Sequence, residues 1–207
     1  MITTGFVAIW IAWLLAAGSP GPATMGIAGT AMIEGRRAGL AFALGICAGS
    51  AAWGAAAALG LSAIMLANAW VFEVIRYFGV AYLGWLAIKA LRRAATPDEV
   101  ALGNPVSGTL GAIFAKGAAI HLTNPKAILA WGSIYAIVAP NGASLSMLLG
   151  YFSMLFAGSL VVFISYAFLF SSERTVRTYR RARRWFDVAF AGFFGFACYK
   201  ILTVKLV

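Results

Sequence analysis

This chain has very few charged residues, and acidic residues are the scarcest of them. Of its 207 residues only 11% are charged and six are Asp or Glu, whereas 62% are hydrophobic. About a quarter of the residues in an ordinary soluble domain are charged, so this composition excludes that class. Long, almost uncharged runs indicate instead a polytopic membrane protein that folds as one transmembrane domain.

The groups that enzymes and metal sites need are scarce as well. The chain has one His and two Cys, and Cys47 and Cys198 both fall inside apolar runs, where packing is their expected role. An intramembrane enzyme needs a nucleophile with a base, or a bound metal, and a metal transporter needs carboxylate or imidazole ligands. The sequence therefore predicts no enzyme, no metal site and no cofactor. The six acids lie at the ends of apolar runs or in loops, so none is predicted as a proton carrier in mid-membrane: Glu34, Glu73, Asp98, Glu99, Glu173 and Asp187.

Two of the apolar runs contain helix breakers near their middles. The run 5–33 contains Ser-Pro-Gly-Pro at 19–22, and the run 113–139 contains Thr-Asn-Pro-Lys at 123–126. Neither interruption is long enough to be a loop, so each run is predicted to be one span made of two half-helices. A matched pair of interrupted spans in the two halves of a membrane protein is the sequence feature that best indicates a transport site.

Each break is expected to expose backbone groups at membrane depth. A proline has no N–H, and its ring clashes with the carbonyl four residues back, so the carbonyls of Ala16, Gly18 and His121 are freed. In hydrocarbon an unpaired backbone group costs several kcal/mol unless it is buried in protein or lines a polar cavity. Each break is also typical of a helix restart, with Ser19 or Asn124 as N-cap and Pro20 or Pro125 at the first helical position.

Six runs are long enough to cross a hydrocarbon core of roughly 30 Å at about 1.5 Å per residue. The predicted fold is therefore an all-α bundle of six transmembrane helices, the first and fourth broken at their proline motifs. Three spans in each half is an odd number, so the halves would form two inverted repeats. The expected repeats are 5–91 and 113–206, joined by a cytoplasmic loop at 92–112. The expected spans are 5–33, 39–67, 70–91, 113–139, 144–170 and 186–206.

Lys and Arg residues gather in the odd-numbered connections between these spans. By the positive-inside rule those connections are cytoplasmic, so both termini are predicted to be periplasmic. The connection that carries Arg174 to Arg184 is expected to orient the bundle and to contact anionic lipid headgroups. Nucleic-acid binding needs a folded basic face or stacking aromatics, and the net charge of +10 comes with neither. The sequence therefore predicts no nucleic-acid partner.

Several motifs occur in an order that resembles the LysE/RhtB family of amino-acid exporters. After the Ser-Pro-Gly-Pro break come Glu-Gly-Arg-Arg-Ala-Gly-Leu at 34–40, the glycine pair Gly45 and Gly49, and Gly-Leu-Ser-Ala at 60–63. Ala-Tyr-Leu-Gly-Trp at 81–85, Phe-Ala-Lys-Gly at 114–117 and Asn-Pro-Lys-Ala at 124–127 follow. The resemblance implies a homodimeric exporter of amino acids or close derivatives, driven by the proton gradient across the bacterial inner membrane. Members often carry an Asp just after the second glycine, where this chain has Ser50, and this departure argues against a cationic substrate.

An amino acid is a zwitterion, and two broken helices offer partners for both of its charged groups. Half-helix N-termini present N–H groups to a carboxylate, and freed carbonyls suit an ammonium group. The lack of mid-span acids favours neutral substrates. Two deeper tryptophans, Trp53 and Trp131, are core residues or line the pathway with Ser50. The predicted substrate-binding residues are Ser19, Pro20, Gly21, Pro22, Thr123, Asn124, Pro125 and Lys126.

Two residues at the second break keep alternatives open. Lys126 either pairs with the substrate carboxylate or gates the site, or else it caps freed carbonyls or extends to the cytoplasmic surface. His121 lies three residues before Asn124, and it is either a proton relay or a hydrogen-bonded core residue. Two rivals to the amino-acid exporter also stay open: an exporter of another small solute or cation, and a structural membrane subunit that transports nothing.

Overall fold

The computed structural model describes residues 2–67, 69–96, 104–138 and 143–203, and these contain eight α-helices and no strand. The all-helical fold predicted from composition is confirmed for these residues. The helices are α1 (Ile2–Gly18), α2 (Pro22–Ile33), α3 (Arg36–Ala67), α4 (Ala69–Ala95), α5 (Leu110–Leu122), α6 (Pro125–Val138), α7 (Leu145–Leu169) and α8 (Glu173–Thr203).

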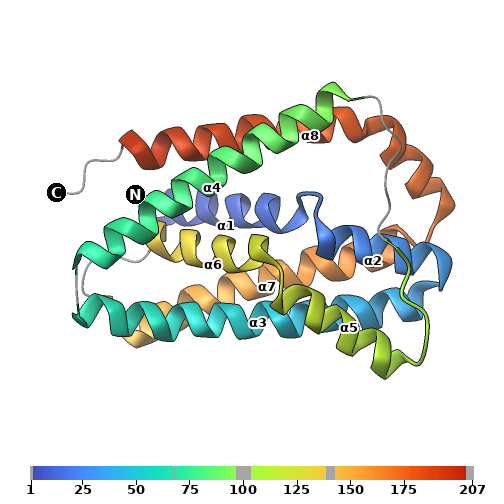
Figure 1. Ribbon diagram of the computed structural model, residues 1–207, viewed down its shortest axis with the longest axis horizontal. Coiled ribbons are helices and arrows are strands. Elements are labelled where there is room, and N and C mark those ends of the chain that lie inside the picture. The colour runs from blue at the N-terminus through green and yellow to red at the C-terminus, as the bar shows by residue number, and fades with distance from the viewer. Residues whose placement is uncertain (1, 68, 97–103, 139–142, 204–207) are drawn as a thin grey trace.

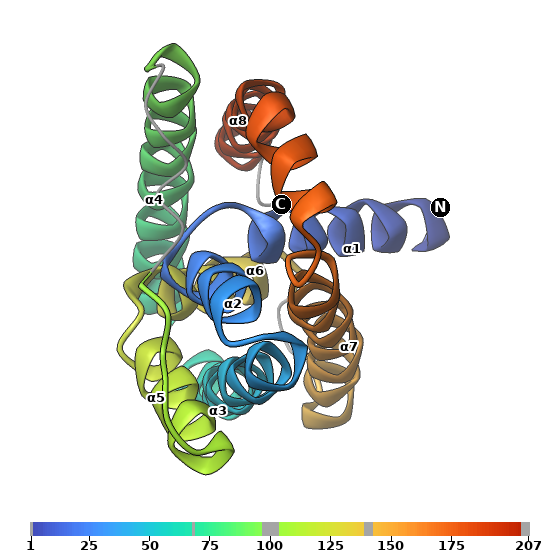
Figure 2. The ribbon, with the colours of Figure 1, turned by 90° about the vertical axis from the view of Figure 1, so that its right-hand side faces the viewer.

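The helices run back and forth along one axis (Figure 1). The α1–α2 pair and the α5–α6 pair run in opposite directions, and α1 begins at the end of the bundle where α8 ends. Figure 2 shows α2 in the middle with α6 behind it, and the remaining long helices around them. Eight of the twelve residues of α2 are buried, and none of the twelve is charged. The half-helix that follows the first break is therefore the central element of the fold.

Both predicted helix breaks are present, but one of the predicted caps is wrong. Asn124 precedes α6, which begins at Pro125 as expected. At the first break the N-cap is Gly21 and α2 begins at Pro22, not at Pro20. A residue before a proline is disfavoured in the helical region, and Gly21 is extended with φ −172° and ψ −179°. Ser19 instead donates from Oγ to the Ala16 carbonyl at 2.9 Å.

The Arg-rich segment expected to be a connection is helical. It forms the first part of α8, which continues without interruption into the last predicted span and bends across the end of the bundle (Figure 1). Arg is a good helix former, and Val176 on this segment is buried against Phe170.

The expected loop at 92–112 is shorter than predicted, since α4 continues to Ala95 and α5 begins at Leu110. Residues 97–103, 139 and 204–206 of the predicted loop and spans lie outside the described residues.

Two helices of the described part are long and apolar enough to cross a membrane, by length and composition alone. They are Arg36–Gly60 of α3 and Leu145–Leu169 of α7. Three shorter apolar helices, Ile9–Gly18, Pro22–Ile33 and Leu110–Leu122, belong to the two broken pairs. A broken span fails a length test because each half is counted separately. The six-span arrangement therefore stays a prediction.

The glycine pair Gly45 and Gly49 of α3 allows a close approach to α5. A Cβ atom added to Gly45 would overlap the backbone carbonyl of Phe114 in α5, and one added to Gly49 would lie 2.8 Å from Cβ of His121. On the facing helix, a Cβ at Gly117 would overlap the carbonyl of Phe42. Small residues allow such contact where lipid gives no hydrophobic drive for association. The contact holds α5, and with it the second break, against α3.

We expect Gly45→Ala to destabilise the protein, because the new methyl group meets backbone that cannot rotate away. The expected loss is about 1–3 kcal/mol, measured as a lower unfolding temperature of the detergent-purified protein. Gly60→Ala on the same helix is the matched control, since nothing lies within 4 Å of its added Cβ. Equal unfolding temperatures for the two variants would contradict the close helix contact.

Candidate functional site

The two breaks touch each other, although more than 100 residues separate them. Lys126, the second residue of α6, donates from Nζ to the carbonyl of Ser19 at 2.6 Å. A Cβ atom added to Gly21 would lie 3.3 Å from Cδ of the same lysine. The sequence predicted that these interruptions would share one site, and the described residues place them together.

Three successive carbonyls at the first break each accept a hydrogen bond from a different helix. Gly18 accepts from the Tyr166 hydroxyl of α7 at 2.6 Å, Ser19 accepts from Lys126 of α6, and Pro20 accepts from Nη1 of Arg93 of α4 at 3.2 Å. Since proline removes the N–H groups that would have bonded some of these oxygens, side chains from the surrounding bundle have taken their place.

The second break is satisfied mostly by its own residues. The Asn124 N–H donates to the His121 carbonyl at 3.1 Å, and the Asn124 side-chain oxygen accepts the Lys126 N–H at 3.0 Å. Trp53 donates from Nε1 to the Leu122 carbonyl at 3.1 Å. Thr123 is exposed, and its hydroxyl donates to Ala119 at 2.9 Å. The α6 N-terminus therefore has little donor capacity left for a ligand.

The N-terminus of α2 is different, because its cap is a glycine with no side chain. The Thr24 hydroxyl accepts the Gly21 N–H at 3.0 Å. Ala23 and Thr24 lie in the first turn of α2, where N–H groups have no carbonyl of a preceding helical turn to bond. Both residues line the cavity between the breaks. Free N–H groups and the positive end of the helix dipole together form a site suited to a carboxylate.

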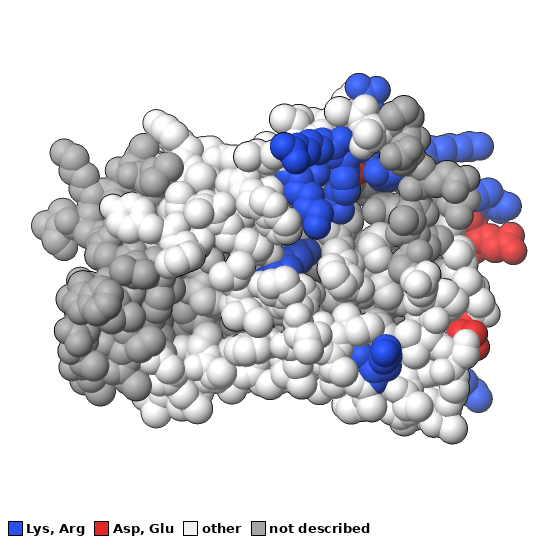
Figure 3. Space-filling model, viewed as in Figure 1, with Lys and Arg blue, Asp and Glu red and all other residues white. Residues whose placement is uncertain are grey.

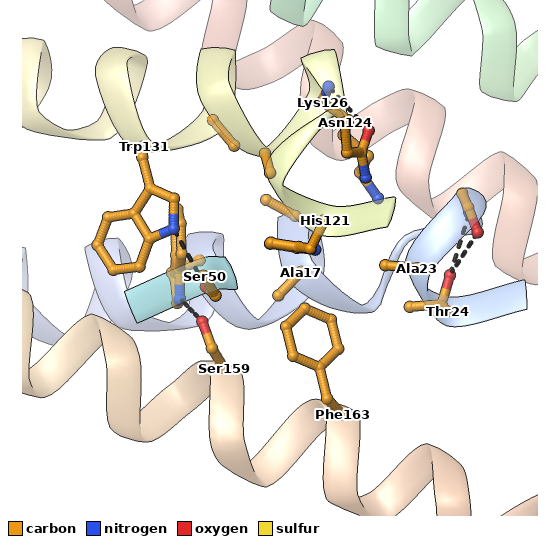
Figure 4. Close-up of a pocket in the computed structure, with 15 residues that line it drawn as sticks. Ala17, Ala23, Thr24, Ser50, His121, Asn124, Lys126, Trp131, Ser159 and Phe163 are labelled. Carbon is orange, nitrogen blue, oxygen red and sulfur yellow. Dashed lines mark hydrogen bonds between the residues drawn. The ribbon is translucent and has the colours of Figure 1, made fainter. Parts of the chain in front are cut away.

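A small central cavity of about 30 Å³ lies between the two breaks (Figure 4). On the scale where one water needs roughly 10–15 Å³, it holds about two waters and not an amino acid. Trp131 donates to Ser50 at 3.1 Å and Trp13 donates to Ser159 at 2.9 Å, so both buried indoles are satisfied. The polar residues that line the cavity are Thr24, Ser50, His121, Asn124, Lys126 and Ser159.

His121 is the unsatisfied group of this cavity. Its side chain is 5% exposed and packs edge-on against Phe163 at a ring distance of 5.7 Å. Its Nδ1 atom is buried with no hydrogen-bond partner among the described residues. Ser50 and Trp131 line the cavity with it, whereas Trp53 does not.

A larger side cavity of about 320 Å³ adjoins the central one. It lies between the first break, α4, α6 and α8, and Gly21, Asn124 and Lys126 line both spaces. Ser19, Pro20, Pro22 and Pro125 line the side cavity alone, with Lys89 and Arg93 of α4. Figure 3 shows Lys and Arg side chains gathered beside a hollow on this face. Of the predicted binding residues, only Thr123 lines neither cavity.

Sequence reasoning missed three residues at the first break. Two of them donate hydrogen bonds to its carbonyls, and the third pairs with one of those two. Arg93 was assigned to topology, Tyr166 carried no motif, and Asp187 was placed at a span end. Asp187 is in fact 1% exposed and pairs with Arg93 at 3.0 Å and with Arg183 at 3.5 Å. The i, i+4 spacing of Arg183 and Asp187 on one helix was the available signal. Arg183, one of the residues expected to contact lipid headgroups, forms this pair from one helical turn before Asp187.

Comparison with known proteins identifies relatives over nearly the whole chain. A family model described as LysE type translocator matches residues 14–203. The threonine efflux protein of Escherichia coli is 31% identical over 202 residues, which cover 96% of this chain and 98% of that protein. The leucine efflux protein of Klebsiella pneumoniae is 29% identical over 168 residues, covering 80% of this chain and 77% of that protein. No solved structure matches the chain.

We expect Tyr166→Phe to destabilise the first break, because it leaves the Gly18 carbonyl without its donor. The loss should be about 1–3 kcal/mol, with faster amide exchange in residues 19–25 by hydrogen–deuterium exchange. Tyr77→Phe removes the same hydroxyl from a side chain that is 60% exposed and serves as control. Unchanged exchange at the break in Tyr166→Phe would show that this bond does not hold it.

Proposed function

We propose that this chain, which belongs to the LysE type translocator family, is a secondary active exporter of neutral amino acids or close derivatives. The observation that carries the proposal is the contact of Lys126 with the Ser19 carbonyl. That contact brings two interrupted helices together beside cavities whose lining includes N–H donors, carbonyls and the lysine that joins the two breaks. Broken helices that meet in this way form the substrate sites of several transporter folds.

In the proposed site the substrate replaces the contact between the breaks. Its carboxylate binds Lys126 and the free N–H groups of Ala23 and Thr24, at the positive end of α2. Lys126 then leaves the Ser19 carbonyl, and the substrate ammonium group takes the freed oxygen. The exchange keeps both the Ser19 carbonyl and the Lys126 ammonium group paired, as low-dielectric surroundings require. In this scheme the alternative role of Lys126, as a cap on a freed carbonyl, is its role in the empty site.

The sizes of the two cavities indicate which step of the proposed transport cycle the structure represents. The central cavity is too small for an amino acid, whereas the side cavity lies in the range of about 300–1,000 Å³ found for ligand sites. We infer that substrate enters the side cavity first, and that the half-helices then move apart at the breaks to admit it. Gly18 and Gly21 flank Ser19 and Pro20 and supply the backbone freedom for such a hinge.

The lining of both cavities favours a substrate without positive charge on its side chain. The side chains that line them include Lys89, Arg93 and Lys126 and no acid in the described part of the chain. Ser50, which is uncharged, lines the central cavity. Relatives named for threonine and leucine efflux fit the same class. A cation exporter, which is one form of the first rival, would need carboxylates, and no described residue that lines either cavity carries one.

The proposed function includes a membrane arrangement. We propose six spans in the bacterial inner membrane, with α1–α2 and α5–α6 each forming one broken span, and two inverted repeats at 5–91 and 113–206. The antiparallel course of the two broken pairs supports this (Figure 1). The Lys and Arg residues near the α4–α5 and α7–α8 connections support a cytoplasmic position for that end and periplasmic termini. A homodimer and contact of Arg174 to Arg184 with anionic lipids belong to the same proposal.

Purified protein in proteoliposomes should exchange radiolabelled threonine or leucine across the membrane, and Lys126→Ala should lose at least 90% of that exchange. The reason is that the variant removes the cation that lines both cavities. Lys116→Ala is the matched control, since Lys116 is exposed on α5. Wild-type exchange by correctly inserted Lys126→Ala would reject a role in transport. No exchange of any neutral amino acid by the wild type would favour the structural-subunit rival.

If His121 relays protons, the transport rate of the wild type should depend on pH where histidine titrates, at about pH 5 to 8. The transport rate of the His121→Gln variant should not change across that range. The amide keeps a polar group of similar size in the cavity but cannot take up a proton. The measurement is the initial rate of leucine exchange at a series of matched internal and external pH values, for wild type and variant. A variant whose pH profile follows that of the wild type would leave His121 as a core residue.

A further inference from the structure

The side cavity is surrounded by more positive charge than the protein neutralises. Arg93 and Lys126 line it from partly buried positions and Lys89 from an exposed one, and the Asp187 carboxylate pairs with Arg93. Asp187 is the one acidic side chain paired with this group in the described residues. Buried charge is costly unless it is compensated. A cavity with excess cations therefore indicates an anionic ligand.

Arg93 is the cation best placed to hold that ligand. Its Nη1 donates to the Pro20 carbonyl at 3.2 Å and its Nη2 lies 3.0 Å from the Asp187 carboxylate. Its Nε is buried with no hydrogen-bond partner among the described residues. A guanidinium binds carboxylates through two parallel N–H groups. Arg93 thus reaches the cavity with donor capacity to spare, beside the break where Lys126 also binds.

Asp187 fixes this geometry from a third helix. Its side chain is 1% exposed, and Arg93 and Arg183 flank it at 3.0 and 3.5 Å. Because Asp187 comes from α8 and Arg93 from α4, the pair joins the two helices that form one wall of the cavity. The same wall is apolar further from Arg93, where Leu86 of α4 and Phe194 of α8 are buried. A ligand with a carboxylate at one end and an uncharged body fits these two regions.

We propose that Arg93 is a second carboxylate-binding residue, which captures the substrate in the side cavity, and that Asp187 is the positioning residue that holds Arg93 there. The inference rests on the proposed export of amino acids and adds a residue pair to it. Substrate would meet Arg93 first and pass to Lys126, because both cations line the side cavity and only Lys126 reaches the central one.

The test measures leucine transport in proteoliposomes, with leucinamide, which lacks the carboxylate, as a competing inhibitor. Arg93→Gln should raise the KM for leucine at least tenfold, with the maximal rate within twofold and the inhibition constant of leucinamide unchanged. Asp187→Asn should raise the KM at least threefold. The double variant should be no worse than Arg93→Gln alone, since residues in one network are not additive. Arg92→Gln, on the exposed side of the same turn, is the control.

The outcomes separate this inference from the proposed function. If the wild type transports no amino acid, the proposed function fails. If it transports leucine and Arg93→Gln leaves the KM unchanged, only the inference fails. If Arg93→Gln does not insert, Arg93→Met, which removes the charge and keeps a long side chain, replaces it, and an unchanged leucine KM there would also overturn the inference. A drop in maximal rate and unfolding temperature with equal effects on leucine and leucinamide would make Arg93 and Asp187 a structural pair.

Lipid is a second source of anionic groups, so the transport is repeated in vesicles with and without phosphatidylglycerol in phosphatidylcholine. The proposal predicts the same KM shift of Arg93→Gln in both kinds of vesicle. A shift seen only with phosphatidylglycerol would assign Arg93 to a lipid headgroup and overturn the proposal.

Discussion

Backbone carbonyls freed inside a membrane must find donors, and this requirement organises the molecule. Three successive carbonyls at the first break accept hydrogen bonds from outside their own helices, and Tyr166, Lys126 and Arg93 donate to them from three different helices. In hydrocarbon each unpaired oxygen would cost several kcal/mol. The same bonds draw α4, α6 and α7 around the break, so the packing of the bundle and the chemistry of the site have one cause.

The backbone groups at the two breaks find their hydrogen-bond partners in different ways, and this difference makes the region between the breaks asymmetric. The second break is capped by its own Asn124 and by Trp53, which leaves it closed. The first has a glycine cap, so two N–H groups of α2 stay available at the cavity while its carbonyls depend on distant side chains. A dipolar substrate can compete for those long-range bonds at little cost, because each bond it breaks is replaced by one of its own.

The sequence was informative where a residue type has one physical consequence. The prolines in the two motifs predict that both runs are interrupted, and α2 and α6 do begin at Pro22 and Pro125. The first cap was predicted at Ser19, because the effect of Pro22 on the conformation of Gly21 was not weighed. The roles of Tyr166, Arg93 and Asp187 could not be predicted, since each depends on which helices become neighbours. A charge near a span end is consistent with topology alone, and only the fold shows that Asp187 is buried.

The central claim is that a substrate binds where the two breaks meet. The most direct measurement is an experimental structure of the purified protein with leucine or threonine bound. The account predicts the substrate carboxylate within hydrogen-bonding distance of the Lys126 ammonium group, with the bond between Lys126 and Ser19 broken. A substrate bound away from both breaks, with that bond still in place, would contradict it.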